Sequence, residues 1–181
     1  MAYYKRIACE KVYLSPICMD DADTFTRWIN DPDVNYFLTF YSKTISFEKE
    51  KELLDVIAKS GNHFSIVAQE TDELLGNCGF FSIDETNRAA EMGIFIGNKE
   101  QWGKGYGTCA TQLLLKYGFE NRNFHNICLK VFSFNERAIA CYEKVGFKKQ
   151  GIRREAIIRG NKKYDEIYMD ILADEYWSIY G

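Results

Sequence analysis

Residues 101–115 read QWGKGYGTCATQLLL. Gly103, Gly105 and Gly107 stand at alternate positions, and an amphipathic run begins directly after them. A glycine-rich turn that leads into a helix presents several backbone N–H groups to one point, at the positive end of the helix dipole. Glycine lets the backbone approach an anion closely, and Lys104 adds positive charge. The pattern therefore predicts a site for a phosphate group, without a need for many cationic side chains.

The spacing of these glycines differs from the two common nucleotide-binding motifs. The P-loop pattern GxxxxGK[ST] is absent from the stretch, and so is GxGxxG. On spacing alone, a plain flexible connection before a helix stays open as the alternative interpretation.

Composition and charge narrow the class of protein. The chain has 181 residues, long enough for one domain over 1–181. Its 23 basic and 26 acidic residues give a net charge of -3, so we expect no nucleic-acid partner. No apolar run approaches the ~20 residues that span a bilayer, and the start, MAYYKRIACEK, lacks the apolar region of a signal peptide. We expect a cytoplasmic protein without a membrane partner.

The cysteines and histidines show no metal-ligand spacing. Six cysteines are scattered without a CxxC pair, which argues against a structural zinc site and against a disulfide framework. We expect them to act as small buried hydrophobic residues and expect no bound metal. The two histidines are far apart, and each is expected at a strand edge, with no local support for a cysteine–histidine nucleophile. These residues are Cys9, Cys18, Cys78, Cys109, Cys128, Cys141, His63 and His125.

Periodicity and turn signals predict an alternating order of strands and helices. A short strand around 12–14 precedes a helix that starts near Asp20 and Asp21, and a second helix ends at Gly61. The order predicted is β-αα-βββ-α-β-α-ββ, in which a helix between two strand runs implies a parallel crossover in an otherwise antiparallel sheet. The later strands are expected at 63–69, 74–84, 89–97, 125–132, 147–158 and 163–172, and the later helices at 107–121 and 135–146.

A second motif lies downstream of the glycines. Residues 135–147 fit N-x-x-A-x-x-x-Y-x-x-x-G-F, with Asn135, Ala138 and Tyr142 at its defining positions. Together with WGKGYGT at 102–108, this motif resembles the GNAT superfamily of acetyl-CoA-dependent N-acetyltransferases, in the branch of the spermidine and ribosomal-protein N-terminal acetyltransferases. The resemblance extends over about 12–177 and implies a single α/β domain, with a mixed, mostly antiparallel splayed sheet flanked by helices.

The resemblance also implies roles for particular residues. The loop would cradle the pyrophosphate of acetyl-CoA, the strand at 94–96 would offer backbone groups to the pantetheine arm, and Asn135 would hydrogen-bond the co-substrate. Tyr142 would protonate the departing thiolate. The family often has Gln or Arg where this chain has Trp102, which puts one side-chain contact to the pyrophosphate in doubt. The co-substrate residues implied are Ile94, Phe95, Ile96, Trp102, Gly103, Lys104, Gly105, Tyr106, Gly107, Thr108 and Asn135.

Elementary acid–base chemistry agrees with a tyrosine acid. A free thiol has a pKa of about 8.5 and a phenol of about 10, so proton transfer from Tyr142 to the thiolate is uphill by about 2 kcal/mol. Hydrogen bonding to sulfur as its charge develops could offset that cost. Core packing is the structural alternative for Tyr142. The structural alternative for Asn135 is a role as the N-cap of the helix that follows. That role would still leave donors and acceptors of its side-chain amide for a co-substrate.

The acceptor amine must lose a proton before it attacks. Glu91 begins the otherwise apolar EMGIFI and is the first candidate for the base, because partial burial would make its carboxylate more basic. Glu155, in RREAII, is the second. A solvated strand-end charge is the alternative for Glu91, and entry of a neutral amine without a base also stays open.

The acceptor site is the least determined part. Asp31 and Asp33 lie among aromatic residues in WINDPDVNYFLTFY, a combination that suits a polyamine through ion pairing and cation–π contact. Turn chemistry around Pro32 explains the same residues without a substrate. A protein N-terminal amine and an amino-sugar remain open as acceptors.

Together these patterns predict acetyl transfer from acetyl-CoA to a primary amine by direct attack, without a covalent enzyme intermediate. A non-catalytic acyl-CoA-binding sensor is the alternative, although a sensor would not need Tyr142. The C-terminal DEYWSIYG is predicted to pack either on its own domain or on a second subunit, so a homo-oligomer stays open.

Overall fold

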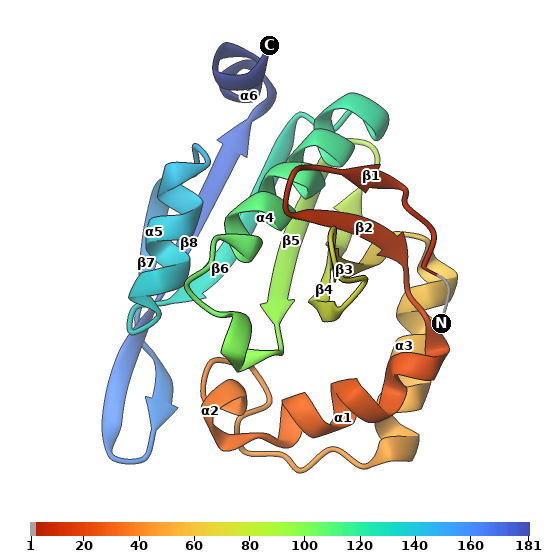
Figure 1. The fold of residues 1–181 in the computed structure, drawn as a ribbon. Coiled ribbons are helices and arrows are strands. Elements are labelled where there is room, and N and C mark those ends of the chain that lie inside the picture. Colours follow the sequence, from red (N-terminus) through yellow and green to blue (C-terminus); the bar gives the residue numbers. More distant parts are fainter. Residues whose placement is uncertain (1–2) are drawn as a thin grey trace. The chain divides into compact units, whose positions relative to one another are not determined.

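The strands of the protein follow one order across the sheet. A computed structural model describes residues 3–181, and within them eight strands are arranged β1-β2-β3-β4-β5-β6-β8-β7 (Figure 1). Their bounds are β1 Ile7–Ala8, β2 Val12–Pro16, β3 His63–Ala68, β4 Leu74–Asp84, β5 Ala89–Ile96, β6 Asn126–Phe132, β7 Lys148–Arg159 and β8 Lys162–Leu172.

The predicted parallel crossover is confirmed. β5 and β6 pair in parallel, with Ala89 opposite Asn126 and Glu91 opposite Cys128. β1 with β2, β2 with β3, β6 with β8 and β7 with β8 all pair antiparallel.

Helices and helical turns occupy the connections. They are η1 Met19–Asp21, α1 Ala22–Asn30, α2 Pro32–Asn35, α3 Phe47–Ser60, η2 Lys99–Gln101, α4 Tyr106–Lys116, the π-helical turn η3 Tyr117–Asn121, α5 Glu136–Lys144 and α6 Ala173–Tyr180. None of the helices within 3–181 combines the length and the apolar composition needed to cross a membrane.

Backbone contacts divide the chain into two compact units. The first comprises Met1–Gly79, described from residue 3, and Ile94–Leu113. Its core includes Tyr13 of β2, Phe25 of α1, Leu54 of α3 and Val67 of β3, each at most 1% exposed. Helix α3 ends where predicted, since Gly61 takes a left-handed φ of 67° that ordinary L-residues avoid.

The second unit comprises Phe80–Gly93 and Leu114–Gly181. Its core is built on β6 and β8, where Ile127, Leu129, Met169 and Ile171 are at most 2% exposed. A Cβ on Gly118 in the π-helical turn would lie 2.6 Å from the Cδ1 atom of Ile127 and 2.8 Å from the Cζ atom of Phe80, so these side chains would have to shift.

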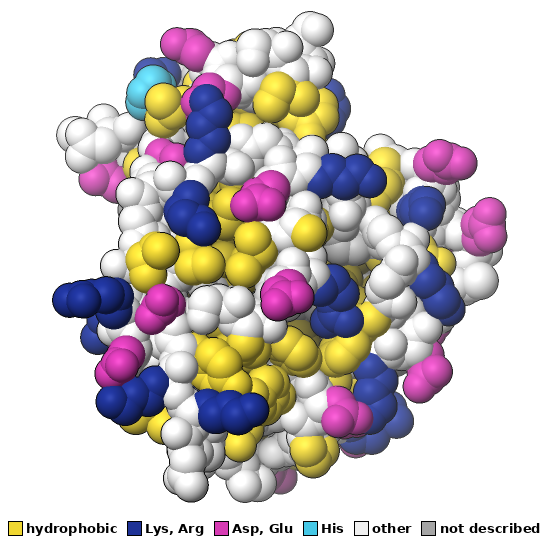
Figure 2. All heavy atoms as spheres, turned by 90° about the vertical axis from the view of Figure 1, so that its left-hand side faces the viewer, with side chains coloured by type: hydrophobic (Ala, Val, Ile, Leu, Met, Phe, Trp, Pro, Cys, Tyr) yellow, Lys and Arg dark blue, Asp and Glu magenta, His cyan; other side chains and the backbone are white. Residues whose placement is uncertain are grey.

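β7 is the edge strand of the second unit, and its outer surface mixes residue types. Ile152 and Ile158 are 51% and 62% exposed, and Arg153 and Arg154 are also exposed. Figure 2 shows a face on which hydrophobic side chains lie among interspersed lysines, arginines and carboxylates. Charges on an edge strand discourage pairing with a strand of another chain.

Some elements were not predicted. β1, α2 and α6 are short or terminal, and the aromatic C-terminal segment forms α6, with Tyr176 buried and Trp177 48% exposed. Asp21 precedes α1 as predicted, but its carboxylate does not cap the helix; it accepts a hydrogen bond of 2.9 Å from the Tyr3 hydroxyl instead.

Candidate functional site

The glycine turn has the conformation that its sequence predicts. Gly103 and Gly105 have φ of 77° and 85°, in the left-handed region that favours glycine. A hydrogen bond of 3.1 Å runs from the Cys109 N–H to the Gly105 carbonyl at the start of α4. The preceding N–H groups of a helix start have no intrahelical partner and are available to an anion.

The space around the turn fits a ligand that touches the backbone. A Cβ built on Gly103 would meet no atom within 4 Å, so the backbone there faces open space. Within α4, the Thr111 hydroxyl donates a hydrogen bond of 2.8 Å to the Gly107 carbonyl. Tyr106 and Thr108 are half-buried. Backbone groups at this turn would hold the phosphates of acetyl-CoA.

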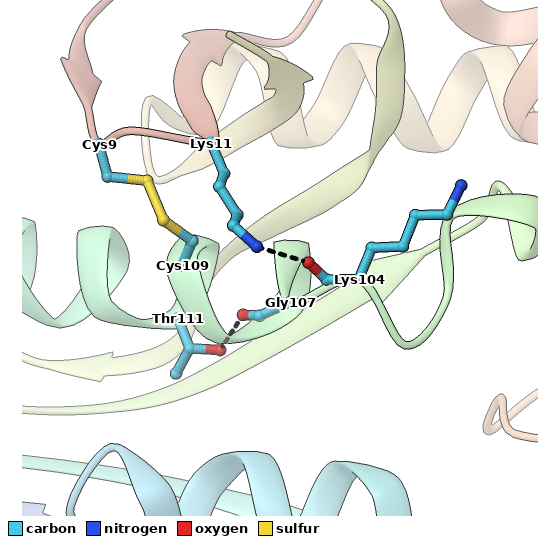
Figure 3. Close-up of a disulfide and its surroundings, with 6 residues drawn as sticks. All are labelled: Cys9, Lys11, Lys104, Gly107, Cys109 and Thr111. Atoms are coloured by element: carbon cyan, nitrogen blue, oxygen red, sulfur yellow. Dashed lines mark hydrogen bonds between the residues drawn. A yellow bond between two sulfur atoms is a disulfide. The ribbon is translucent and has the colours of Figure 1, made fainter.

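Two ammonium groups reach the turn. Lys104 donates to the Gln101 side-chain oxygen at 2.9 Å. Lys11, from the β1–β2 turn, donates to the Lys104 carbonyl at 2.9 Å (Figure 3). The sequence did not single out Lys11, and no local signal could have found it, since 93 residues separate it from Lys104.

A disulfide lies beside these lysines, and it contradicts the prediction from cysteine spacing. Cys9 at the end of the β1 hairpin arm is bonded to Cys109 in the first turn of α4 (Figure 3). The two are 100 residues apart, so their pairing depends on how β1, β2 and α4 pack and leaves no trace in local spacing. The expectation of burial is confirmed only for Cys78; the remaining cysteines are half-buried.

Trp102, the departure from the family pattern, contacts the end of β5 and Phe37. Its indole N–H donates a hydrogen bond of 2.8 Å to the Ile96 carbonyl at the end of β5. Its ring packs edge-on against Phe37, with centroids 5.9 Å apart. The Ile96 carbonyl, one of the backbone groups of 94–96 that were predicted to contact the pantetheine arm, therefore already accepts a hydrogen bond from the indole.

The strand at 94–96 is otherwise placed as the loop requires. Ile94, Phe95 and Ile96 are half-buried, and Phe95 packs against the core of its unit. Ile96 lies next to the turn, because a Cβ built on Gly107 would lie 3.9 Å from its Cγ1 atom. The structure thus brings the predicted pantetheine strand and the predicted phosphate turn together.

Asp33 lines a cavity of about 510 Å³, and it already shares a cation with Asp31. The Lys99 ammonium is 2.9 Å from an Asp31 oxygen and 2.7 Å from an Asp33 oxygen. The hydrogen bond from Lys99 lowers the pKa of Asp31, and the hydrogen bonds to Asp33 and Asp31 raise that of Lys99. The cavity is lined mainly by Asp33, Tyr36, Phe37, Lys99, Glu100 and Trp102.

The turn interpretation of these aspartates also holds. Asp31 is the N-cap of α2, and its side chain accepts a hydrogen bond of 2.9 Å from the Asp33 backbone N–H. Pro32 occupies the first position of that helix, where a missing N–H costs nothing. A cationic acceptor would have to displace Lys99 from both carboxylates.

Asn135 caps α5 as its alternative interpretation predicted. Its Oδ1 atom accepts a hydrogen bond of 3.3 Å from the Ala138 N–H. The Nδ2 atom carries two further donors that a co-substrate could use. The two roles of Asn135 are therefore compatible.

Tyr142 is part of the core of the second unit. It is 8% exposed, and its ring packs edge-on against Phe147 at 5.8 Å. Burial raises the pKa of its phenol above the ordinary value near 10. The hydroxyl is therefore protonated in the folded chain, and it is a poorer acid than an exposed tyrosine.

Glu91 and Glu155 each pair with a lysine. Glu91 on β5 is half-buried and lies 2.9 Å from the Lys130 ammonium of β6. Glu155 is exposed, 2.8 Å from the Lys163 ammonium, with a left-handed φ of 49° inside an irregular part of β7. Of the two carboxylates, Glu91 is the more buried.

Comparison with known proteins identifies the family. A family model described as an acetyltransferase (GNAT) domain matches residues 11–148. The chain is 31% identical over 172 residues to the uncharacterized N-acetyltransferase p20 of Bacillus licheniformis, covering 92% of this chain and 96% of that protein. It is 30% identical over 173 residues to spermidine N(1)-acetyltransferase of Escherichia coli K12, covering 93% and 90%.

The fold has close counterparts among solved structures. Spermidine N-acetyltransferase from Vibrio cholerae, solved in complex with CoA and spermine, superposes with a TM-score of 0.81 at 24% identity, covering 93% of this chain and 99% of that one. This likeness confirms the predicted α/β fold with its mostly antiparallel sheet flanked by helices. With the family model and the curated relatives, it leads to one conclusion: the chain belongs to the GNAT family and is an N-acetyltransferase that uses acetyl-CoA.

Proposed function

We propose that this chain, acting as one catalytic domain over 1–181, transfers the acetyl group of acetyl-CoA to a primary amine by direct attack. The observation that carries the proposal is the glycine turn, where Gly103 and Gly105 take left-handed φ and open space adjoins the start of α4. Acetyl-CoA bound there supplies the thioester. The chain binds its phosphates through backbone N–H groups, with Lys104 adding charge.

Further contacts to the co-substrate are proposed for the strand at 94–96 and for Asn135, the N-cap of α5. Ile94 and Phe95 offer backbone groups to the pantetheine arm, while the Ile96 carbonyl stays with the Trp102 indole. Asn135 donates from Nδ2 while its Oδ1 atom continues to cap α5.

Tyr142 is proposed as the general acid that protonates the departing CoA thiolate. Its raised pKa keeps the proton on the phenol until negative charge develops on the sulfur. A buried hydroxyl donates more strongly to a developing anion than a solvated one does, because little water competes. Its packing on Phe147 fixes the ring direction.

The amine loses its proton to Glu91, to Glu155, or to water before it binds. Glu91 is the better placed of the two carboxylates, since it is half-buried and Glu155 is exposed. Glu91 forms an ion pair with the Lys130 ammonium. If Glu91 takes the proton from the amine, Glu91→Gln should lower kcat while the Kd for acetyl-CoA stays unchanged.

Direct attack is favoured over an intermediate on Cys9, Cys78, Cys109 or Cys128. Cys9 and Cys109 are bonded to each other, and burial raises the pKa of Cys78 and of Cys128. A thiol with a raised pKa holds little thiolate at neutral pH and is a poor nucleophile.

For the acceptor, we propose a polyamine of the spermidine class ahead of a protein N-terminal amine or an amino-sugar. Support comes from the spermidine N(1)-acetyltransferase relative, which covers 93% of this chain. It also comes from the cavity, which Asp33 lines together with the rings of Tyr36 and Phe37, and from Asp31, which shares the Lys99 ammonium with Asp33. Cations bind favourably to both carboxylates and aromatic faces.

The test combines product identification with one substitution. Purified protein with acetyl-CoA is given spermidine, N-terminal peptides and amino-sugars, and products are read by mass. Tyr142→Phe should lower kcat about 100-fold, as loss of a general acid does, with the acetyl-CoA Kd unchanged. Tyr176→Phe removes a hydroxyl from another buried tyrosine, 3% exposed, and should leave kcat within about twofold. Equal loss of kcat and affinity in Tyr142→Phe would make that tyrosine structural.

A further inference from the structure

Lys11 is held firmly although its side chain is exposed. It lies in the tight turn between β1 and β2, which is closed by a hydrogen bond of 2.9 Å from the Cys9 N–H to the Val12 carbonyl. The Lys11 carbonyl accepts a second hydrogen bond of 2.9 Å, from the Gln69 N–H. Both bonds fix the backbone from which the lysine side chain extends.

The ammonium of Lys11 lies on the glycine turn. It donates to the Lys104 carbonyl at 2.9 Å, and it is 3.3 Å from the position that a Cβ of Gly105 would take. A lysine ammonium has three donors. Within residues 3–181 the Lys104 carbonyl is its one hydrogen-bond acceptor, which leaves two donors for a ligand at the turn.

The disulfide joins the two segments that meet here. Cys9 begins the turn that carries Lys11, and Cys109 lies in the first turn of the helix that follows the glycines (Figure 3). The disulfide and the Lys11–Lys104 hydrogen bond therefore connect the same two segments, the β1–β2 turn and the segment that leads into α4. After loss of the covalent bond, the direct link from Lys11 to the glycine turn is a solvent-exposed hydrogen bond.

We propose that Lys11 binds the pyrophosphate of acetyl-CoA at the glycine turn, and that the Cys9–Cys109 disulfide holds it there, so that reduction weakens co-substrate binding. This inference rests on the assignment of the turn as the pyrophosphate site. An ammonium fits an anion at this point because it adds a charge to backbone dipoles that carry only partial charges.

The redox step is an ordinary thiol–disulfide exchange. A thiolate of a dithiol reductant attacks one cysteine sulfur, the other cysteine leaves as a thiolate, and the second reductant thiol resolves the mixed disulfide. The protein gains two electrons and two protons as two thiols, and the reductant leaves as its own disulfide. Cys9 and Cys109 thereby act as positioning residues for Lys11.

The first measurement is acetyl-CoA affinity by calorimetry on the oxidised protein. Lys11→Met should weaken binding about fivefold, the scale of an exposed charge-assisted hydrogen bond. Lys51→Met, which removes one exposed lysine from α3, is the charge-matched control and should leave the Kd unchanged. An unchanged Kd for Lys11→Met would overturn the proposal.

The second measurement tests the disulfide. Wild-type protein treated with a phosphine reductant, with two additional alkylated cysteines confirmed by mass, should bind acetyl-CoA about threefold more weakly. The double variant Cys9→Ser/Cys109→Ser should match it without reductant. In the reduced protein, Lys11→Met should weaken acetyl-CoA binding little further. An equal effect of Lys11→Met in both redox states would refute the coupling.

The third measurement separates the phosphates of the co-substrate. Dephospho-CoA keeps the pyrophosphate and lacks the 3′-phosphate, so Lys11→Met should weaken its binding by the same factor. If the effect vanished with dephospho-CoA, the assignment to the pyrophosphate would be wrong.

Gly105→Val distinguishes failure of this inference from failure of the proposed function. If Gly105→Val weakens acetyl-CoA binding and Lys11→Met does not, only the role of Lys11 fails. If both variants bind as the wild type does, the turn is not the pyrophosphate site and the proposed function loses its main support.

Discussion

The glycine turn at 103–107 and the acidic turn at 31–33 both belong to the first unit, and both were predicted to bind charged groups. They differ in what the folded chain offers a ligand. At the glycine turn, backbone groups face open space where Gly103 lacks a side chain. At the acidic turn, Asp31 and Asp33 already share the Lys99 ammonium.

The difference has a physical cause. The N–H groups at a helix start cannot find partners within their own helix, so they remain available unless a side chain caps them. Side-chain carboxylates do not stay available in this way, because a nearby lysine with a long, flexible side chain can form an ion pair with them at little energetic cost. A binding site made of backbone N–H groups therefore stays available in the folded protein. At a site made of charged side chains, a ligand competes with the protein's own charged groups.

The largest effect that tests this contrast is expected from Gly105→Val. Gly105 has φ of 85°, which a β-branched residue adopts only with strain of about 2 kcal/mol. Acetyl-CoA affinity should fall about 30-fold, because the turn must rearrange away from the shape that binds the anion. Titration by calorimetry measures it.

Gly160→Val is the matched control for that variant. Gly160 also has a left-handed φ, 57°, and a Cβ there would meet nothing within 4 Å. It should lose similar stability with no loss of acetyl-CoA affinity. Equal affinity loss in both variants would mean that backbone strain in general, rather than the glycine turn, controls binding.

The next effect is on protein stability and concerns Glu50, a buried carboxylate that, unlike Asp31 and Asp33, has no lysine partner among the described residues. Glu50 on α3 is 5% exposed, has no ion pair within the described residues 3–181, and burial raises its pKa to about 7. The unfolded chain has the lower pKa, so stability is full below about pH 4.5 and falls as the pH rises towards 7. Glu50→Gln should therefore stabilise the protein by about 2 kcal/mol at pH 8 and by little at pH 4.5.

Thermal unfolding measures this prediction, with a Tm gain of about 5 °C at pH 8 for Glu50→Gln. Glu48→Gln, at an exposed position of the same helix, should show no pH-dependent difference. A gain independent of pH would show that Glu50 is not a buried acid. Its contrast with the lysine-paired aspartates would then disappear.

A smaller effect is expected from Lys99→Met. Removal of the internal cation frees Asp31 and Asp33, so KM for spermidine should fall about tenfold if these carboxylates bind the acceptor. Steady-state kinetics at saturating acetyl-CoA measures it. Lys49→Met, which breaks an exposed pair with Glu52 on α3, is the control. An unchanged KM for Lys99→Met would remove the acidic turn from the acceptor site.

Much of the fold was predictable, and the misses have physical reasons. The long strands and α3 follow from clear periodicity with Ser46 and Gly61 as caps. β1 has only two residues, and α2 four, so neither carries a periodic signal. The C-terminal α6 was missed because Tyr176 and Trp177 sit in an aromatic segment with no Gly or Pro boundary before it.

The candidate site divides in the same way. Gly103, Gly105, Asn135 and Tyr142 could be proposed from the sequence, because a turn, a cap or a motif is a local pattern. Lys11 was missed because its partner in the fold is far away in the sequence.

The sequence by itself determined the family, the parallel crossover and the glycine turn, because these follow from residue spacing within motifs and from the order of strand and helix segments along the chain. Tertiary structure alone decided that Cys9 meets Cys109 and that Lys99 neutralises the aspartates. The reason is that such contacts join segments distant in the chain, and the gain from each pairing exists only after packing has brought the partners within a few ångströms.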